Sequence, residues 1–352
     1  MTRRILTTLL AVAVAVPAFA EPDRIDVNRR KTTVSTREAW AARFQDSRHG
    51  PEVIERFNKV AKVGRTGALD LSNIAGDITV TGGGGDEIRI EAVKRARSRN
   101  DADARQLLEE MRIDVIETGA RVEVRTQYPR NRRNFSGSVD YVVTIPTGGS
   151  ATLRSVSGDV RVTNIKGELR AESVSGDMVT SGATRLSLVK TVSGDVEVTD
   201  AAADGEITVS TVSGNLTARG LEARALDLGS VSGDVILSDI TTERATVKTV
   251  SGGIEYSGPL ARNGRYEMTA HSGTVRLAVS ETSGFELDAT TFNGDVRCDF
   301  PLTLRSGIQD GTGRGRRNLN RSIRGSFGDA GAIVILKSFS GDIVITKAGG
   351  RR

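Results

Sequence analysis

The chain has 352 residues, with 49 Lys and Arg against 44 Asp and Glu, so its formal net charge at pH 7 is only +5. Its single cysteine excludes a disulfide framework. Aromatic residues make up 4% of the chain, too few for the stacking platforms of a single-stranded nucleic-acid binder, so we expect no nucleic-acid partner.

The first twenty residues have the pattern of a secretory leader. Arg3 and Arg4 precede an apolar run from Ile5 to Val16, and Pro17 and a small-x-small triplet follow. The pattern predicts a signal peptide over residues 1–20, cut before Glu21. No cysteine lies at the cleavage point, so we expect no lipoprotein anchor, and no later stretch approaches the roughly 20 apolar residues of a membrane span. Periplasm, secretion and the cell surface all remain open.

Two segments precede the regular part of the chain. Residues 21–62 are polar and read as an arm or linker with a short helix that opens at Ser35-x-x-Glu38, a capping-box pattern. Residues 63–148 are rich in strand patterns and contain a helix pattern near 101–111. Because solenoid ends expose unpaired strand edges, we expect this second segment to cap the repeats.

Ten copies of a motif based on Ser-Gly-Asp recur along the chain. Between Gly158 and Gly294 the successive motif glycines are 18, 18, 20, 19, 19, 21 and 21 residues apart. If the residue before Ser-Gly is position 0, positions −5, −3, +4 and +6 are mostly apolar, as in Ile207 and Val209 or Val235 and Leu237. Period-two alternation on both sides of a glycine predicts two half-buried strands joined by a corner.

Glycine suits such a corner because it accepts a positive φ, and Asp suits it because its side chain can bind neighbouring amides. We therefore assign structural turn roles to Gly76, Gly158, Asp159, Gly176, Asp177, Gly194, Asp195, Gly214, Gly233, Asp234, Gly252, Gly273, Gly294, Asp295, Gly341 and Asp342. Position −1 predicts a stacked hydroxyl ladder of Ser155, Ser173, Thr191, Thr211, Ser230, Thr249, Thr291 and Ser338.

A twenty-residue unit buries its apolar face only by stacking on its neighbours. The predicted fold is an all-β, single-chain β-solenoid (β-helix) of about 20-residue coils over residues 149–347, with turns one above the next and one or two short helices near the N-terminus. Propeller blades need about 40 residues, which is twice this period. Residues 348–352 form a tail.

A Gly- and Arg-rich stretch at residues 311–328 predicts a long loop before the last module. It contains a basic cluster suited to an anionic partner: Arg314, Arg316, Arg317, Arg321 and Arg324.

The recurring Asp residues allow two chemical readings besides turn capping. Stacked carboxylates could hold calcium, but Asn215, Gly253 and Thr274 interrupt the column, so we favour capping and expect no metal and no cofactor. A polysaccharide-cleaving enzyme would need carboxylates gathered in one groove of the folded surface. We expect no enzyme, and we expect structural roles for His271 and Cys298.

The segments Leu69-Asp70-Leu71-Ser72-Asn73-Ile74-Ala75-Gly76-Asp77-Ile78-Thr79-Val80 and Val142-Val143-Thr144-Ile145-Pro146, with the Ser-Val-Ser-Gly-Asp copies, resemble the bacterial putative-adhesin domain family. The resemblance covers most of the chain after residue 55. It implies stacked β repeats and a cell-envelope setting, and it lends no catalytic residues.

The leading hypothesis is an exported, non-catalytic envelope scaffold, adhesin-like, that binds a surface polymer (glycan, peptidoglycan or lipid headgroup) or another envelope protein. The alternatives are a polysaccharide-active hydrolase or lyase and a periplasmic protein that senses envelope stress. The sequence leaves the oligomeric state open.

Overall fold

A computed structural model describes residues 50–129, 136–304 and 321–348. The expected signal peptide (1–20), the helix expected from Ser35 and residues 349–352 of the tail lie outside this part. No helix in the described residues is long and apolar enough to cross a bilayer.

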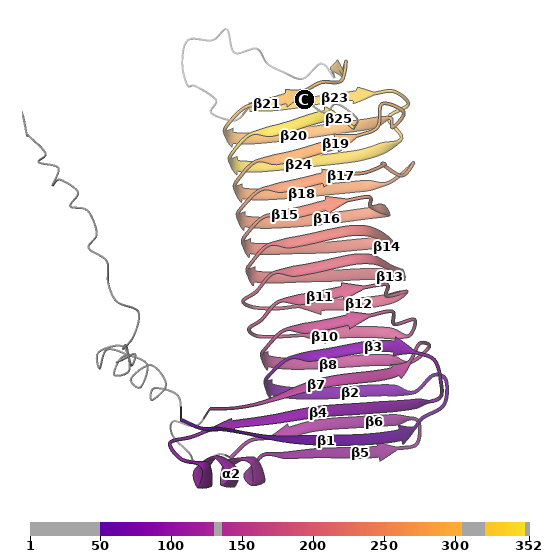
Figure 1. Ribbon diagram of the computed structural model, residues 1–352. Helices are drawn as coiled ribbons and strands as arrows, with labels where there is room; N and C mark the ends of the chain where they lie inside the picture. Colours follow the sequence, from indigo (N-terminus) through magenta and orange to yellow (C-terminus); the bar gives the residue numbers. More distant parts are fainter. Residues whose placement is uncertain (1–49, 130–135, 305–320, 349–352) are drawn as a thin grey trace, which may run out of the picture. The chain divides into compact units, whose positions relative to one another are not determined.

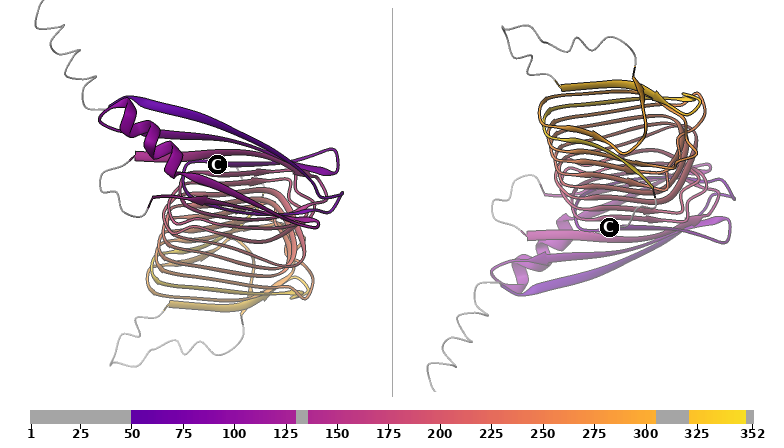
Figure 2. Two further views of the ribbon diagram at one scale, coloured as in Figure 1. Left: turned by 90° about the horizontal axis from the view of Figure 1, so that it is seen from below. Right: turned by 90° about the horizontal axis from the view of Figure 1, so that it is seen from above.

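The described chain is a stack of β coils with two walls (Figures 1 and 2). One wall contains β8 (Ser150–Ser157), β10 (Glu168–Glu172), β12 (Arg185–Lys190), β16 (Thr241–Ser251) and β18 (Arg265–Ser272). The other contains β9 (Val160–Thr163), β11 (Met178–Ser181), β15 (Val235–Ser238), β17 (Ile254–Ser257) and β19 (Val275–Val279). The long strands β13 (Val196–Ser213) and β14 (Leu216–Ser232) pair in both walls. All these pairings are parallel, which confirms the expected β-solenoid.

The core is built from the alternating positions of the repeat. Leu226 lies opposite Ala245 in the register of one wall, and Val235 lies opposite Ile254 in the other. All four side chains are at most 1% exposed. Because the pairing repeats in register, each apolar position stacks on its equivalent in the next coil, and the coils share one continuous core.

At the N-terminal end the order of coils in space differs from their order in the chain. The coil of β2 (Ala68–Ala75) and β3 (Ile78–Gly83) pairs with β8 and β9 on one side. On its other side it pairs with β6 (Arg121–Gln127) and β7 (Ser136–Pro146). The first coil therefore lies between two later ones, although its turn glycine Gly76 still stacks next to Gly158, the turn glycine of the following motif copy. The position of the first coil is set by its pairing with β6 and β7, which lie far along the chain.

Antiparallel strands finish this end. β4 (Glu87–Arg97) pairs antiparallel with β7 and with β1 (Glu52–Lys62), and β5 (Arg112–Thr118) pairs antiparallel with β6. Residues 52–62 thus belong to the sheet, which corrects their assignment to a polar arm. The side chains of β1 are mostly exposed on both faces, so the sequence looks like a linker. Backbone pairing with β4, and not side-chain burial, makes this segment a strand.

The helix expected near 101–111 is α2 (Asp101–Glu110). The Asn100 side chain caps it by accepting the Asp103 N–H at 2.8 Å. At its other end the buried Lys94 of β4 donates to the carbonyl oxygens of Leu108 (3.3 Å) and Met111 (3.2 Å). These contacts hold the helix against the end of the stack.

The C-terminal end shows a second exchange of order. The last coil consists of β24 (Ala332–Ser340) and β25 (Ile343–Lys347). On one side it pairs with β18 and β19. On the other side it pairs with β20 (Phe285–Asn293) and β21 (Val296–Cys298). The final coil in sequence is therefore an inner coil in space (Figure 1).

The loop expected at 311–328 also contains a strand. β23 (Arg321–Phe327) pairs antiparallel with β20 and with β22 (Thr303–Leu304), while residues 311–320 lie outside the described part. Phe327 lies 4.7 Å from Phe300 and 5.7 Å from Phe285 between ring centroids. This aromatic contact, made by residues distant in sequence, orders a segment whose glycines and arginines predict a loop.

Gly194 offers a direct test of the stacked corners. Its φ is +138°, and a Cβ there would lie 2.2 Å from the Gly176 carbonyl oxygen of the coil below. We expect Gly194→Val to lower the free energy of unfolding by about 3 kcal/mol or more, because strain and overlap add. Thermal unfolding measures it. Gly205→Val, at a site with open space, should change it by about 0.5 kcal/mol at most. Equal effects would contradict the stacked corner.

Candidate interaction surface

The motif glycines form one column along the corner of the stack. A Cβ added at each motif glycine would lie 1.9–2.3 Å from the glycine carbonyl oxygen of the level before it, and at the first level it would meet Val139 O instead. These contacts give the order from the N-terminal end: Gly76, Gly158, Gly176, Gly194, Gly214, Gly233, Gly252, Gly273, Gly341 and Gly294. All have a positive φ except Gly294, on the last level. Glycine is thus required at most levels by conformation and at all of them by close approach.

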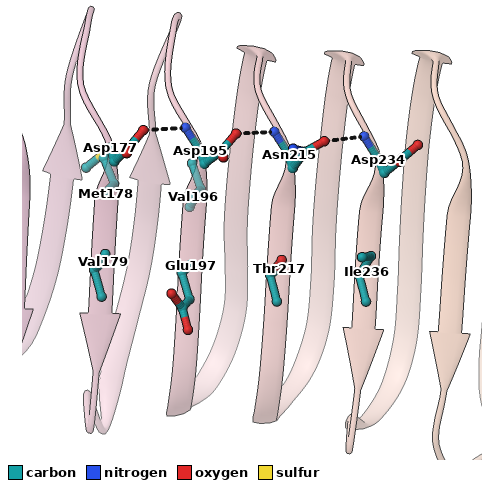
Figure 3. A pocket seen from close by; sticks show the side chains of 10 residues that line it. All are labelled: Asp177, Met178, Val179, Asp195, Val196, Glu197, Asn215, Thr217, Asp234 and Ile236. Atoms are coloured by element: carbon teal, nitrogen blue, oxygen red, sulfur yellow. Dashed lines mark hydrogen bonds between the residues drawn. The ribbon is translucent and has the colours of Figure 1, made fainter. Parts of the chain in front are cut away.

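The Asp residues form a hydrogen-bonded ladder on the outside of this corner (Figure 3). Asp177 Oδ1 accepts the Asp195 N–H (2.9 Å), and Asp195 Oδ1 accepts the Asn215 N–H (2.7 Å). Asn215 makes the same bond through its amide oxygen to the Asp234 N–H, at 3.0 Å. The ladder begins at Asp140 of β7 and includes Asp77, Asp159, Asp234 and the pair Asp342–Asp295. The side chain therefore satisfies a backbone amide that the bent strand leaves without a partner.

A second ladder lies inside the same corner. Buried hydroxyl groups at position −1 donate to the glycine carbonyl of the preceding level, as Thr211 does to Gly194 O (3.1 Å) and Ser230 does to Gly214 O (3.0 Å). At the first coil Asn73 replaces the hydroxyl and donates to Val139 O at 2.8 Å. Ser155 Oγ is buried without a partner among the described residues. Each typical level is thus held to the next by one bond outside and one inside.

Both ladders are interrupted at the same place. Gly253 and Thr274 stand where the other copies have Asp or Asn, and Ala270 stands at position −1. The amides of Thr274 and Asp342 accordingly have no carboxylate acceptor from the coil below within the described chain. Neither corner bond joins the Gly252 and Gly273 levels among the described residues, whereas Ser338 Oγ still donates to Gly273 O (3.1 Å) between the Gly273 and Gly341 levels.

Position 0, beside the glycine, forms an exposed apolar ridge along the same corner. Ten levels contribute Ile74, Val156, Val174, Val192, Val212, Val231, Val250, His271, Phe339 and Phe292. The nine apolar members are each 40–50% exposed. At the C-terminal end the rings of His271, Phe339 and Phe292 stack with centroids 4.9 Å apart and planes within 6°. The parity of the repeat contains the signal for this ridge, because position 0 must point outward when −5, −3 and −1 point inward.

Next to the ladder lies a shallow groove of about 440 Å³. It is lined by Asp177, Asp195 and Asp234 of the corner, and by the outward side chains of Val179, Glu197, Thr217 and Ile236 (Figure 3). Four carboxylates and no basic residue line it. None of the four has an ion-pair partner among the described residues, whereas Asp159 pairs with Arg161 at 3.0 Å. The groove is therefore a negatively charged strip bordered by apolar groups.

The predicted basic cluster is divided by the structure. Arg314, Arg316 and Arg317 lie outside the described residues. Arg321 forms an ion pair with Asp295, and Arg324 Nε lies 3.2 Å from Asp288 Oδ1. The two described arginines are thus engaged by carboxylates of the chain itself.

The other candidate groups offer little reactive chemistry. Within the described chain no three His, Cys, Asp or Glu residues gather as a metal site. Cys298 is half-buried and packs against the core, and burial raises the pKa of its thiol. Burial likewise raises the pKa of Tyr128 to about 12, and its hydroxyl donates to Ala75 O at 2.8 Å beside the first corner. Cys298 and Tyr128 therefore have contacts that stabilise the fold.

A protein-family model, described as Toastrack DUF4097, matches residues 66–346. The chain belongs to this family. The match includes the first coil, both exchanged ends and all ten levels of the glycine column, so the resemblance to the putative-adhesin domain family is confirmed. Among curated proteins, no sequence matches significantly.

Three solved structures are similar to this Toastrack chain at low identity. A putative adhesin from Parabacteroides distasonis ATCC 8503 is 12% identical with a TM-score of 0.47, and one from Bacteroides fragilis NCTC 9343 is 13% identical with a TM-score of 0.37. Each alignment covers 83% of this chain and 97% of the other. A putative cell adhesion protein from Clostridium sporogenes ATCC 15579 is 11% identical with a TM-score of 0.22, covering 84% and 100%.

The ladder predicts how substitutions at Asp195 behave. Asp195→Ala removes the acceptor of the Asn215 amide, so we expect the free energy of unfolding to fall by about 1 kcal/mol. Asp195→Asn keeps an acceptor oxygen, as Asn215 does, and should cost at most about 0.5 kcal/mol. Urea unfolding of the two variants measures the difference. A larger loss for Asn than for Ala would refute the assigned role.

Proposed function

We propose that this Toastrack protein is an exported, non-catalytic scaffold of the cell envelope that binds an extended partner along the corner of its solenoid. The observation that carries the proposal is the ridge of nine half-exposed apolar side chains that follows the stack beside the Asp ladder. A continuous exposed apolar strip marks an interaction surface more often than scattered apolar residues do. Export is proposed from the leader pattern of residues 1–20.

The chemistry of the groove favours one class of partner. Asp177, Asp195, Glu197 and Asp234 give it negative charge, and Val179 and Ile236 give it apolar contacts. A complementary ligand combines cationic and apolar groups at short spacing, as an extended segment of another envelope protein does. Anionic glycans and lipid headgroups fit this groove less well, because its four carboxylates carry the same sign of charge as such ligands.

One observation favours the alternative that the protein is a polysaccharide hydrolase. Such an enzyme needs carboxylates gathered in one groove, and this groove contains four carboxylates. A glycosidase also needs a protonated carboxyl group with a role distinct from its neighbour. Here each Asp inside the groove accepts the corner amide of the next level, as Asp77 and Asp159 do outside the groove, and Asn215 accepts such an amide in the same way. The repeat therefore accounts for the cluster, and we rank binding above catalysis. Sugar release from envelope polysaccharide that is lost in Glu197→Gln would reverse this ranking.

Binding along the ridge is testable with defined peptides. We expect a peptide of alternating Lys and Val to bind the purified protein, measured by fluorescence anisotropy at low salt, and a Glu–Val peptide to bind at least about tenfold more weakly. The double variant Val192→Ser with Val231→Ser should weaken the first peptide about tenfold, because two ridge contacts are lost.

Ile333→Ser is the matched control, since Ile333 is 43% exposed on β24, away from the corner. It should bind as the parent does. Equal losses in the ridge variant and the control, or a preference for the Glu–Val peptide, would refute the assigned surface. Retention of the parent protein, but not the ridge variant, on isolated envelope fractions would extend the result to the native setting.

A further inference from the structure

Strand β1 ends its wall of the solenoid and leaves one edge open. Among the described residues it pairs only with β4, from Glu52–Arg97 through Lys62–Glu87. It lies at the end of the stack opposite β23 (Figure 1). An edge strand presents a row of unpaired N–H and C=O groups, which is a template for another strand.

This edge carries charged side chains but lacks three other common protections against pairing, which are a short strand, a bulge and an internal proline. β1 is eleven residues long, its only proline neighbour is Pro51 just before it, and its register with β4 runs without a bulge. Ile54 and Val60 on its outer face are 54% and 49% exposed. Natural edge strands are commonly short, bulged or interrupted by proline, so a long regular edge with exposed apolar groups suits β-augmentation.

The sequence of β1, EVIERFNKVAK, is complementary to its own reverse. If two copies pair antiparallel about Phe57, Glu52 faces Lys62, and Glu55 faces Lys59. In the same register Val53 faces Ala61, Ile54 faces Val60, Arg56 faces Asn58, and Phe57 faces itself. Opposite charges and apolar pairs directly across from each other stabilise antiparallel strands.

Other registers lack this complementarity. A shift of the two-fold axis to Asn58 places Ile54 opposite Lys62 and Phe57 opposite Lys59, and a shift to Arg56 places two Arg56 side chains opposite each other. Parallel in-register pairing puts every charge opposite its like. Only the register about Phe57 matches all positions, so the pattern specifies both orientation and register.

We propose that β1 binds β1 of a second copy of this chain in an antiparallel, two-fold symmetric pair about Phe57. The wall that contains β1 then continues from one protomer into the other, and the same residues serve on both sides, as a two-fold interface requires. Glu52, Glu55 and Lys59 already pair within the chain with Arg97 (3.3 Å), Lys94 (2.8 Å) and Glu117 (2.9 Å), and these pairs lie next to the new ones.

Sedimentation velocity on the purified protein at several concentrations tests the dimer. We expect a monomer–dimer equilibrium, with the dissociation constant raised at least tenfold by Glu52→Lys or by Lys62→Glu, because each creates two like-charge contacts. The double variant Glu52→Lys with Lys62→Glu restores opposite charges and should return within threefold of the parent. Glu109→Lys, an exposed charge reversal on α2, is the control and should leave the dimer unchanged.

Mixed disulfide formation tests the register in a Cys298→Ser background. Arg56 and Asn58 face each other across the proposed axis, so a mixture of Arg56→Cys and Asn58→Cys chains should cross-link more than either chain alone. Thermal unfolding confirms that each variant is folded.

A monomer at every concentration would overturn the proposal, as would a dimer that ignores both single charge reversals. So would a double variant no better than the single ones, or cross-linking without preference for the mixed pair.

Discussion

The close approach of one glycine corner to the next is the constraint on which the solenoid depends. The backbone bends at every level, and the position of a Cβ at each motif glycine is occupied by the carbonyl group of the level before it. This approach leaves a carbonyl and an amide outside the strand ladders. The inner hydroxyl and the outer carboxylate satisfy these two groups, as at Thr211 and Asp195. Ser/Thr, Gly and Asp therefore recur together because one geometric problem recurs.

The ends of the stack meet a different requirement, which is to stop the parallel pairing. At each end an early or late coil is placed one level inside, and antiparallel strands follow: β4, β1 and β5 at one end, β23 at the other. The last coil in sequence is thereby enclosed between two others, so both edges of β24 are paired. The β23 end is covered by an aromatic cluster, whereas the β1 end keeps an exposed edge.

The repeat made the solenoid, its period, its core positions and both corner ladders predictable from the sequence, because these follow from local alternation and turn chemistry. The exchanged coil order was not predictable, since it depends on pairing between β2 and β6 or β18 and β24, which no local pattern encodes. β1 and β23 were missed because their side chains are polar or small and their order comes from neighbouring backbones. The ridge at position 0 follows from the parity of the repeat, because position 0 alternates with the inward positions −1, −3 and −5. The groove could not be predicted from the sequence, because its lining residues come from successive levels whose register only the three-dimensional structure shows.

The column of Asp residues serves the architecture of the corner, where each side chain accepts a backbone amide of the next level. Residue-resolved amide hydrogen exchange tests this role most directly, because the chain contains its own controls. Amides with an acceptor from the coil below, such as those of Asp195, Asn215 and Gly253, should exchange slowly. Those of Thr274 and Asp342, where the ladder is interrupted, should exchange at least about tenfold faster, since a lost hydrogen bond is worth about 1 kcal/mol or more. Equal protection at all these corners would contradict this role.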